Sequence, residues 1–192
     1  NSITGLASGF RDLDKMTLGL HGGELIILAA RPAMGKSALA LNLAAHAAIS
    51  GEKAVLLFSL EMSAEQLGMR LLSQESRVSL FGLRSGELEP QDRDAMFETM
   101  KTLKQTNIFM DTTPGLTVSD IRARARRLKM EGRCDLIVVD YLQLVQPRPG
   151  VSSREQAVAE ISRSLKQIAL ELDIPVISLS QLNRAVESRN DK

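Results

Sequence analysis

The sequence predicts an α/β protein in which helices cover both faces of a doubly wound, mostly parallel β-sheet. Short apolar runs alternate along the 192 residues with longer segments of helical periodicity, which is the order of strand–helix–strand units. The apolar runs are unbroken rather than alternating, as in strands that are covered on both sides. Right-handed crossovers connect such strands and place the helices on the faces of the sheet.

The predicted strands and the helices between them follow from local signals. The strands are expected at 25–29, 54–59, 108–111, 136–140 and 175–180. The first helix, 36–50, is rich in Ala and Leu and stops before Gly51. The second and fourth helices begin with the spacing of capping boxes, and the third with a proline that suits a first helical turn. These three are expected from Ser63 towards Ser76, from Pro90 towards Lys104 and from Thr117 to Gly132.

The last predicted helix opens at Ser153 and carries one apolar stripe. Its apolar residues recur at three-and-four spacing, which is typical of a helix that packs one face on a sheet. The stripe consists of Val158, Ile161, Leu165, Ile168 and Leu172. The segment before this helix, 146–153, has two prolines, a glycine and two serines, and is therefore predicted to be a loop.

The composition indicates one globular domain and excludes several classes of protein. With 192 residues, 44% of them hydrophobic, the chain is long enough for a substantial core. The net charge of +1 excludes a uniformly basic surface, so any nucleic-acid contact must come from local patches. Cys134, the one cysteine of the sequence, is expected to be buried and fits a reducing compartment. The sequence has neither a membrane-spanning run nor a signal pattern, so we expect a cytoplasmic protein.

Residues 30–37 have the pattern of a phosphate-binding loop. The sequence Ala-Arg-Pro-Ala-Met-Gly-Lys-Ser follows the first apolar run and opens the first helix. In such loops backbone N–H groups surround the phosphates, the lysine meets the β and γ oxygens, and the hydroxyl meets Mg²⁺. The helix N-terminus adds partial positive charge. We therefore predict that ATP and Mg²⁺ bind here, with contacts from Ala33, Met34, Gly35, Lys36, Ser37 and Ala38.

Ala30 departs from the general phosphate-loop pattern, which has glycine at this position. An alanine cannot reach positive φ at low energetic cost. We therefore expect Ala30 at negative φ as the last strand residue, with the turn made by Arg31 and Pro32. The alternative is an ordinary strand–turn–helix corner that binds no ligand.

Two acidic residues follow predicted strands on the side where such sheets bind ligands. Asp140 ends the run 136–140 and can support Mg²⁺ opposite Ser37. Glu61 follows the run 54–59 and can orient or deprotonate a water aimed at the γ-phosphate. The alternatives are a turn or helix cap for Asp140 and a solvent-facing first-turn residue for Glu61.

Gln181 follows the last predicted strand, and its amide can both donate to and accept from a γ-phosphate or a neighbouring loop. Arg70 lies on the helix after Glu61 and could reach a nucleotide. For both residues, and for Arg184, an ordinary exposed polar side chain is the alternative interpretation.

Basic residues at two places are candidates for nucleic-acid contact. Arg122, Arg126 and Lys129 share one face of a predicted amphipathic helix, which favours an ordinary solvated face. Arg148 and Arg154 flank the Pro/Gly loop after Asp140 and could bind nucleic-acid phosphates without reading bases. The alternative for these two is a plain surface loop.

Taken together, these motifs resemble the C-terminal motor domain of bacterial replicative DNA helicases of the DnaB type. The resemblance extends over essentially the whole chain, and the Ala-Arg-Pro opening is the family's own form of the loop. The segments that carry it are Thr4-Gly-Leu, Gly9-Phe, Leu13-Asp14, residues 30–37, Ser59-Leu-Glu-Met62, Asp140-Tyr-Leu-Gln-Leu144 and Ser178-Leu-Ser-Gln-Leu-Asn-Arg184.

The resemblance implies a RecA-like P-loop NTPase core and a ring of six subunits around single-stranded DNA. ATP would lie between neighbouring subunits, and its hydrolysis would drive 5′-to-3′ movement and strand separation at the replication fork. A primase and a helicase loader are the implied partners. By position, Lys36 and Ser37 would bind phosphate and Mg²⁺, Asp140 would support the metal, Glu61 would be the catalytic base and Gln181 the γ-phosphate sensor.

Two family features fall outside the sequence. We expect residues 1–192 to be a single RecA-like ATPase domain that lacks the family's N-terminal domain and ends before the arginine finger and the main DNA-contacting loop. Such a chain is expected to bind nucleotide but to hydrolyse it poorly alone. A RecA-type recombinase and a nucleotide-dependent loader or switch are the alternative functions.

Overall fold

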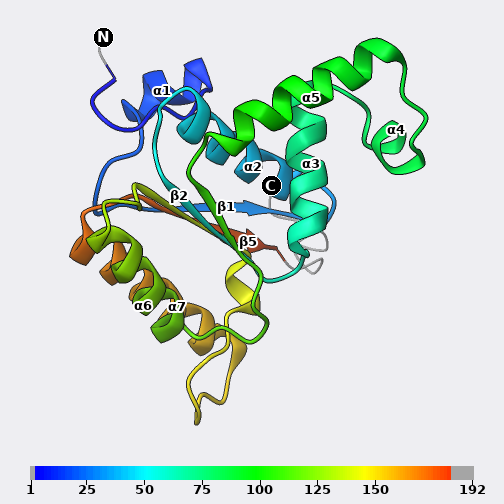
Figure 1. Ribbon diagram of the computed structural model, residues 1–192. Coiled ribbons are helices and arrows are strands. Elements are labelled where there is room, and N and C mark those ends of the chain that lie inside the picture. The colour runs from blue at the N-terminus through cyan, green and yellow to red at the C-terminus, as the bar shows by residue number, and fades with distance from the viewer. Residues whose placement is uncertain (1–2, 183–192) are drawn as a thin grey trace, which may run out of the picture.

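The computed structural model describes residues 3–182, which form a five-stranded parallel sheet between layers of helices (Figure 1). The strands are β1 (Leu25–Ala30), β2 (Val55–Ser59), β3 (Ile108–Asp111), β4 (Leu136–Asp140) and β5 (Val176–Gln181). Their order across the sheet is β1-β5-β4-β2-β3, and every neighbouring pair is parallel. This arrangement confirms the predicted doubly wound α/β fold.

The order of the strands decides which face each helix covers. The chain steps one way across the sheet from β1 to β2 and β3, and then returns to β4 and β5. Because right-handed crossovers reverse face when the direction reverses, the later helices lie opposite the earlier ones (Figure 1). On one side are α2 (Lys36–Ile49), α3 (Ala64–Ser76), α4 (Leu80–Ser85) and α5 (Pro90–Lys104), and on the other α6 (Val118–Met130) and α7 (Arg154–Leu172).

Two apolar cores fill the space on either side of the sheet. Val55 and Leu57 of β2 pack in the core beneath α2, while Leu56 and Phe58 of the same strand pack in the core beneath α6 and α7. This alternation is the pleat of a strand that is buried on both faces. Cys134 lies in the second core at 1% exposure, as expected, and burial raises the pKa of its thiol to about 11.

The helix signals of the sequence are confirmed at their first turns. Ser63 and Thr117 form complete capping boxes, and Pro90 is in the first turn of α5. The stripe on α7 faces the sheet, with Leu165 fully buried, and Ser153 caps this helix by accepting from Gln156. The capping residues and the apolar face predict the same helix, so both local hydrogen bonds and packing against the sheet favour it.

Three short elements were not predicted. They are α1 (Arg11–Thr17), α4 and the 3₁₀ turn η1 (Leu142–Leu144), and each is too short for its period to be visible in a sequence. Strands β2 and β5 each begin one residue later than predicted, at Val55 and Val176. Ala54 is outside β2 because its N–H donates to the Asp135 side chain (2.8 Å), and Pro175 is outside β5 because proline has no N–H for the ladder.

The strands separate at the carboxyl edge of the sheet. The β1–β5 ladder continues to Gln181 and the β2–β4 ladder to Asp140, but the β4–β5 ladder stops at Val139 and Ser178. Open α/β sheets bind ligands at this edge. The gap between β4 and β5 therefore lies where the sequence predicts the site.

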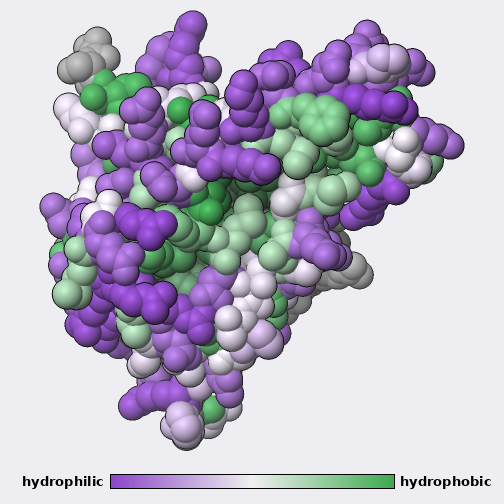
Figure 2. All heavy atoms as spheres, viewed as in Figure 1, coloured by the Kyte–Doolittle hydropathy of each residue, from purple (hydrophilic) through white to green (hydrophobic). Residues whose placement is uncertain are grey.

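Helices α4 and α5 extend beyond the sheet and pack on α3 (Figure 1). No described residue of α5 is buried, and Phe81 and Phe97 are 75% and 61% exposed. Figure 2 shows apolar atoms among hydrophilic ones over α5. None of the helices formed by residues 3–182 has both the length and the apolar character needed to cross a membrane.

Candidate nucleotide-binding site

The phosphate loop lies between the end of β1 and the start of α2, as predicted. Ala30 is the last residue of β1 and is not among the residues with positive φ, which confirms the expectation for this position. The turn extends further than Arg31 and Pro32, because Ala33 (φ 62°) and Gly35 (φ 83°) both have left-handed backbone. Left-handed residues among right-handed ones turn successive N–H groups towards one side, which forms an anion-binding concavity.

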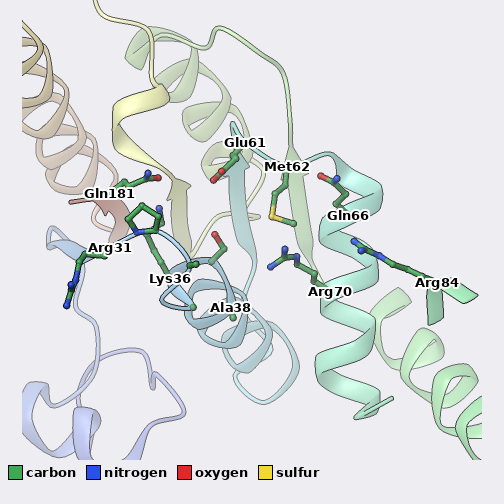
Figure 3. Close-up of a pocket in the computed structure, with 13 residues that line it drawn as sticks. Arg31, Lys36, Ala38, Glu61, Met62, Gln66, Arg70, Arg84 and Gln181 are labelled. Atoms are coloured by element: carbon green, nitrogen blue, oxygen red, sulfur yellow. The ribbon is translucent and has the colours of Figure 1, made fainter. Parts of the chain in front are cut away.

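The loop forms one wall of a cavity of about 550 Å³. The predicted residues Ala33, Gly35, Lys36, Ser37 and Ala38 all line it. Met34, which is 67% exposed, is not among the residues that line it. The opposite walls come from other strand ends and from α3 and α4, with Glu61, Gln66, Arg70, Arg84 and Gln181 (Figure 3).

Asp140 lies beside Lys36 and Ser37, at the end of β4. It is 2% exposed, and one carboxylate oxygen, Oδ1, has no hydrogen-bond partner among the described residues. Burial raises the pKa of this carboxyl, and the Ser37 hydroxyl and the Lys36 and Arg70 charges oppose that rise. A buried acidic oxygen without a donor is costly unless a cation completes its surroundings.

The oxygen donors at this point fit a magnesium ion. Mg²⁺ prefers hard oxygen ligands and is held by one or two protein groups together with phosphates and waters. Ser37 and Asp140 supply such donors. No group of three or more His, Cys, Asp or Glu residues placed to hold a metal occurs within residues 3–182.

Glu61 lines the cavity from the bend between β2 and α3. It precedes the N-cap Ser63 by two residues and so is not in the first turn of α3, although it is exposed, as the alternative of a solvent-facing glutamate expects. Three hydrogen bonds fix this bend. The Ser59 hydroxyl donates to the Met62 carbonyl (3.2 Å) and accepts from the Met62 N–H (3.3 Å), and the Leu60 N–H donates to the Asp140 carbonyl (2.9 Å). The bend that carries Glu61 is therefore tied to the strand end that carries Asp140.

Two cations lie near these acids. The Lys36 ammonium is 4.3 Å from the centre of the Tyr141 ring, a cation–π contact. Arg70 points towards the phosphate loop from α3 (Figure 3), so it lies where it could reach a nucleotide. Gln66 lies four residues before Arg70, on the same face of α3, and the helical period could have identified it. Arg84 had no such signal, because α4 has six residues.

The structure places Gln181 at the end of β5, in register with Ala30, where it lines the cavity. It also borders a second cavity of about 750 Å³, together with Pro32, Gln143 and Arg154. Arg184 lies outside the described residues, as does Asn183 of the same motif.

The basic residues that the sequence offered as candidates for nucleic-acid contact do not line the cavity at the phosphate loop. Arg148 is 74% exposed, and its guanidinium binds both oxygens of Glu160 at 3.0 Å. Arg154, the first residue of α7, lines the second cavity instead. On α6, Arg122 and Arg126 contact Glu171 of α7, so their charges link two helices. Ile121 and Ala125 on the opposite face are buried, which confirms the amphipathic helix.

Comparison with known proteins adds three findings. Residues 5–192 match the family model described as the DnaB-like helicase C terminal domain. The chain is 50% identical over 191 residues to the replicative DNA helicase DnaB of Geobacillus stearothermophilus, and 49% identical to the replicative DNA helicase DnaC of Bacillus subtilis. In each case 99% of this chain but 42% of the relative is aligned, so the chain spans less than half the length of these curated relatives.

Solved structures are similar over the same range. One that is described as an ATPase domain superposes with a TM-score of 0.93 at 34% identity, covering 99% of this chain and 68% of that one. A second structure, described as that of a DnaB-like replicative helicase and its interactions with primase, superposes with a TM-score of 0.91 at 34% identity, covering 100% of this chain and 46% of that one.

Proposed function

The chain belongs to the DnaB-like helicase C-terminal domain family, and on this premise we propose that it is the ATP-driven motor of a bacterial replicative DNA helicase. The motor hydrolyses ATP to move along single-stranded DNA and to separate the strands of a duplex. Its relatives are named as helicases, which favours this activity over a RecA-type recombinase or a switch with little turnover.

One observation carries the proposal. The phosphate loop, Glu61 and Gln181 converge on one cavity from three different strand ends, with Asp140 buried at a fourth. The Oδ1 oxygen of Asp140 is buried without a hydrogen-bond partner in the described part of the chain. Such an oxygen is unfavourable in an acid that only stabilises the fold, whereas an acid that supports a cation needs a free oxygen for it. The same convergence serves phosphoryl transfer, which depends on positioning and on charge stabilisation.

Each residue has a role in the proposed reaction. Lys36 and the loop N–H groups hold the β- and γ-phosphates, and Arg70 adds positive charge from α3. Glu61 orients the attacking water and takes its proton, and Gln181 hydrogen-bonds the γ-phosphate. Ser37 and Asp140 would hold Mg²⁺, which neutralises charge on the phosphates when bound.

The proposed partners follow from the family. A ring of six subunits would bind single-stranded DNA in its centre, and a loader and a primase would contact it in the cytoplasm. The similar helicase structure with primase supports the last of these. Arg148 and Arg154 remain predicted phosphate contacts, and Arg148 would have to exchange Glu160 for DNA.

Glu61→Gln tests the proposed catalytic base. Without a carboxylate to accept the proton, ATP turnover by the assembled, DNA-bound protein should fall by about 10²–10⁴-fold. Binding of ATP with Mg²⁺ should stay within about twofold, because the amide keeps the size of the side chain. Turnover is measured as phosphate release and binding by calorimetry.

Glu65→Gln is the matched control. Glu65 is exposed in the first turn of α3 and does not line the cavity, so this change should leave both quantities unaltered. Equal turnover by the Glu61→Gln and unsubstituted proteins would remove Glu61 from the reaction. A protein without turnover of its own would support a switch instead.

A further inference from the structure

The gap between β4 and β5 is bridged by one side chain. Where the β4–β5 ladder ends, β5 continues for three more residues, from Leu179 to Gln181, while β4 turns away into η1. On its other side β5 remains paired with β1, and Leu182 N–H donates to Ala30 (3.0 Å). The main chain of Gln181 thus has a strand on one side and an opening on the other.

Gln143 of η1 fills this opening with its amide. Its Oε1 accepts from the Gln181 N–H (3.2 Å), and its Nε2 donates to the Gln181 carbonyl (3.2 Å). The same Nε2 donates to the Ser180 hydroxyl (2.9 Å). In a parallel ladder the N–H and C=O of one residue are likewise both satisfied by the neighbouring strand. A side-chain amide has the donor and acceptor of a peptide group, and so Gln143 takes the place of the missing strand.

The turn that carries Gln143 is itself firmly held. Leu142 and Val145, on either side of it, are each 2% exposed in the core beneath α6 and α7. Gln146 N–H donates to the Leu116 carbonyl (2.8 Å), which fixes the start of the loop 146–153. Asp140 is three residues before Gln143. The amide therefore joins a rigid segment, continuous with the acid, to the strand end that carries Gln181.

We propose that Gln143 is a positioning residue that holds Gln181 at the nucleotide cavity by replacing the strand pairing that β4 gives up. The proposal rests on the proposed function, in which the Gln181 side chain hydrogen-bonds the γ-phosphate. Gln143 acts on the nucleotide only through Gln181.

Discrimination between triphosphate and diphosphate tests this role. Dissociation constants of a non-hydrolysable ATP analogue and of ADP, both with Mg²⁺, are measured on the 192-residue chain. Gln143→Ala should weaken the analogue about fivefold, the effect of one misplaced hydrogen bond, and leave ADP within about twofold. The double variant with Gln181→Ala should bind the analogue no more weakly than Gln181→Ala alone, because the two residues act in series.

Three further variants make the result specific. Ser180→Ala removes one of the three amide contacts but neither bond to Gln181, and should keep discrimination within about twofold. Gln105→Ala, an exposed glutamine at the end of α5, should change nothing. If Gln143→Ala does not fold, Gln143→Glu replaces it, because it keeps the acceptor for the Gln181 N–H but cannot donate to the carbonyl.

The outcomes separate this inference from the proposed function. An unsubstituted chain that binds neither nucleotide would contradict the proposed function itself. If that chain discriminates and a folded Gln143 variant discriminates equally well, Gln143 does not position Gln181. The role would likewise be overturned if Gln143→Ala weakened binding of the analogue and of ADP equally. It would also be overturned if the losses of analogue binding from the two single substitutions added up in the double variant.

Discussion

At the scale of single residues, the site contains two energetically unfavourable features. Asp140 is a buried acid with an oxygen that no described group satisfies, and Ala33 has left-handed backbone. Such features cost stability, and a functional site keeps them when activity needs them. They are therefore the residues at which stability and activity should respond in opposite directions.

Asp140→Asn should stabilise the fold while weakening its metal-dependent binding. Burial raises the pKa of Asp140 in the folded protein, so its charged form is destabilising. This penalty is absent below the unfolded pKa, grows as pH rises through the folded pKa and is complete above it. At neutral pH the melting temperature of the variant should be about 2–4 °C higher for each kcal/mol of burial penalty that the substitution removes. The difference in melting temperature between the two proteins should become smaller as the pH is lowered. Thermal melts across pH measure it.

Asp94→Asn on α5 is the control for that experiment, because Asp94 is exposed and does not line the cavity. It should shift the melting temperature little at any pH. In parallel, Mg²⁺ should strengthen ATP-analogue binding by the unsubstituted chain but much less by Asp140→Asn. A variant that melts lower than the unsubstituted chain at neutral pH would show that Asp140 contributes favourable contacts.

At the scale of elements, α7 shows how a sequence pattern becomes a packed face. Leu165 is fully buried against the sheet, whereas Leu170, five residues later, is 60% exposed. Leu165→Ala should lower the free energy of unfolding by about 2–5 kcal/mol, because it leaves a cavity in the core. Leu170→Ala should change it by less than about 0.5 kcal/mol. Denaturant unfolding gives both values, and equal effects would contradict the packing described for this helix.

The elements also show what a sequence can and cannot reveal. The strand at 136–140, the capping boxes at Ser63 and Thr117 and the stripe on α7 could be predicted, because each depends on neighbours in the chain. Helix α4, with Arg84, could not, because six residues do not display a period. The bond between Gln143 and Gln181 joins residues 38 positions apart, and only the folded chain brings them together.

At the scale of the whole molecule, the cavity is lined by residues from several elements of one chain. The loop, Glu61 and Gln181 line it together with Arg70 and Arg84 (Figure 3). In the proposed ring, a cation from the next subunit would complete the surroundings of the transferred phosphoryl group. The phosphate side of the site could be predicted from the sequence, whereas the place of Arg84 in it depends on the packing of α4 against α3.

The isolated chain should therefore bind ATP but turn it over slowly. A cation supplied by a neighbouring subunit contributes about 10³–10⁵ in the rate of phosphoryl transfer. Phosphate release by the 192-residue chain is compared with release by the assembled protein on single-stranded DNA, at equal site concentration. Rapid, DNA-stimulated hydrolysis by the isolated chain would show that the site is already complete within one subunit.

The burial of Cys134 has a practical consequence for following this protein in solution. With the thiol pKa at about 11, its thiolate fraction at neutral pH is ~10⁻⁴, and the core shields the sulfur from reagents. A cysteine introduced at exposed Ser152 would react with a maleimide dye first, with the native residue left in place. Fluorescence from that one position would then report directly on the loop 146–153 as nucleotides and DNA are added.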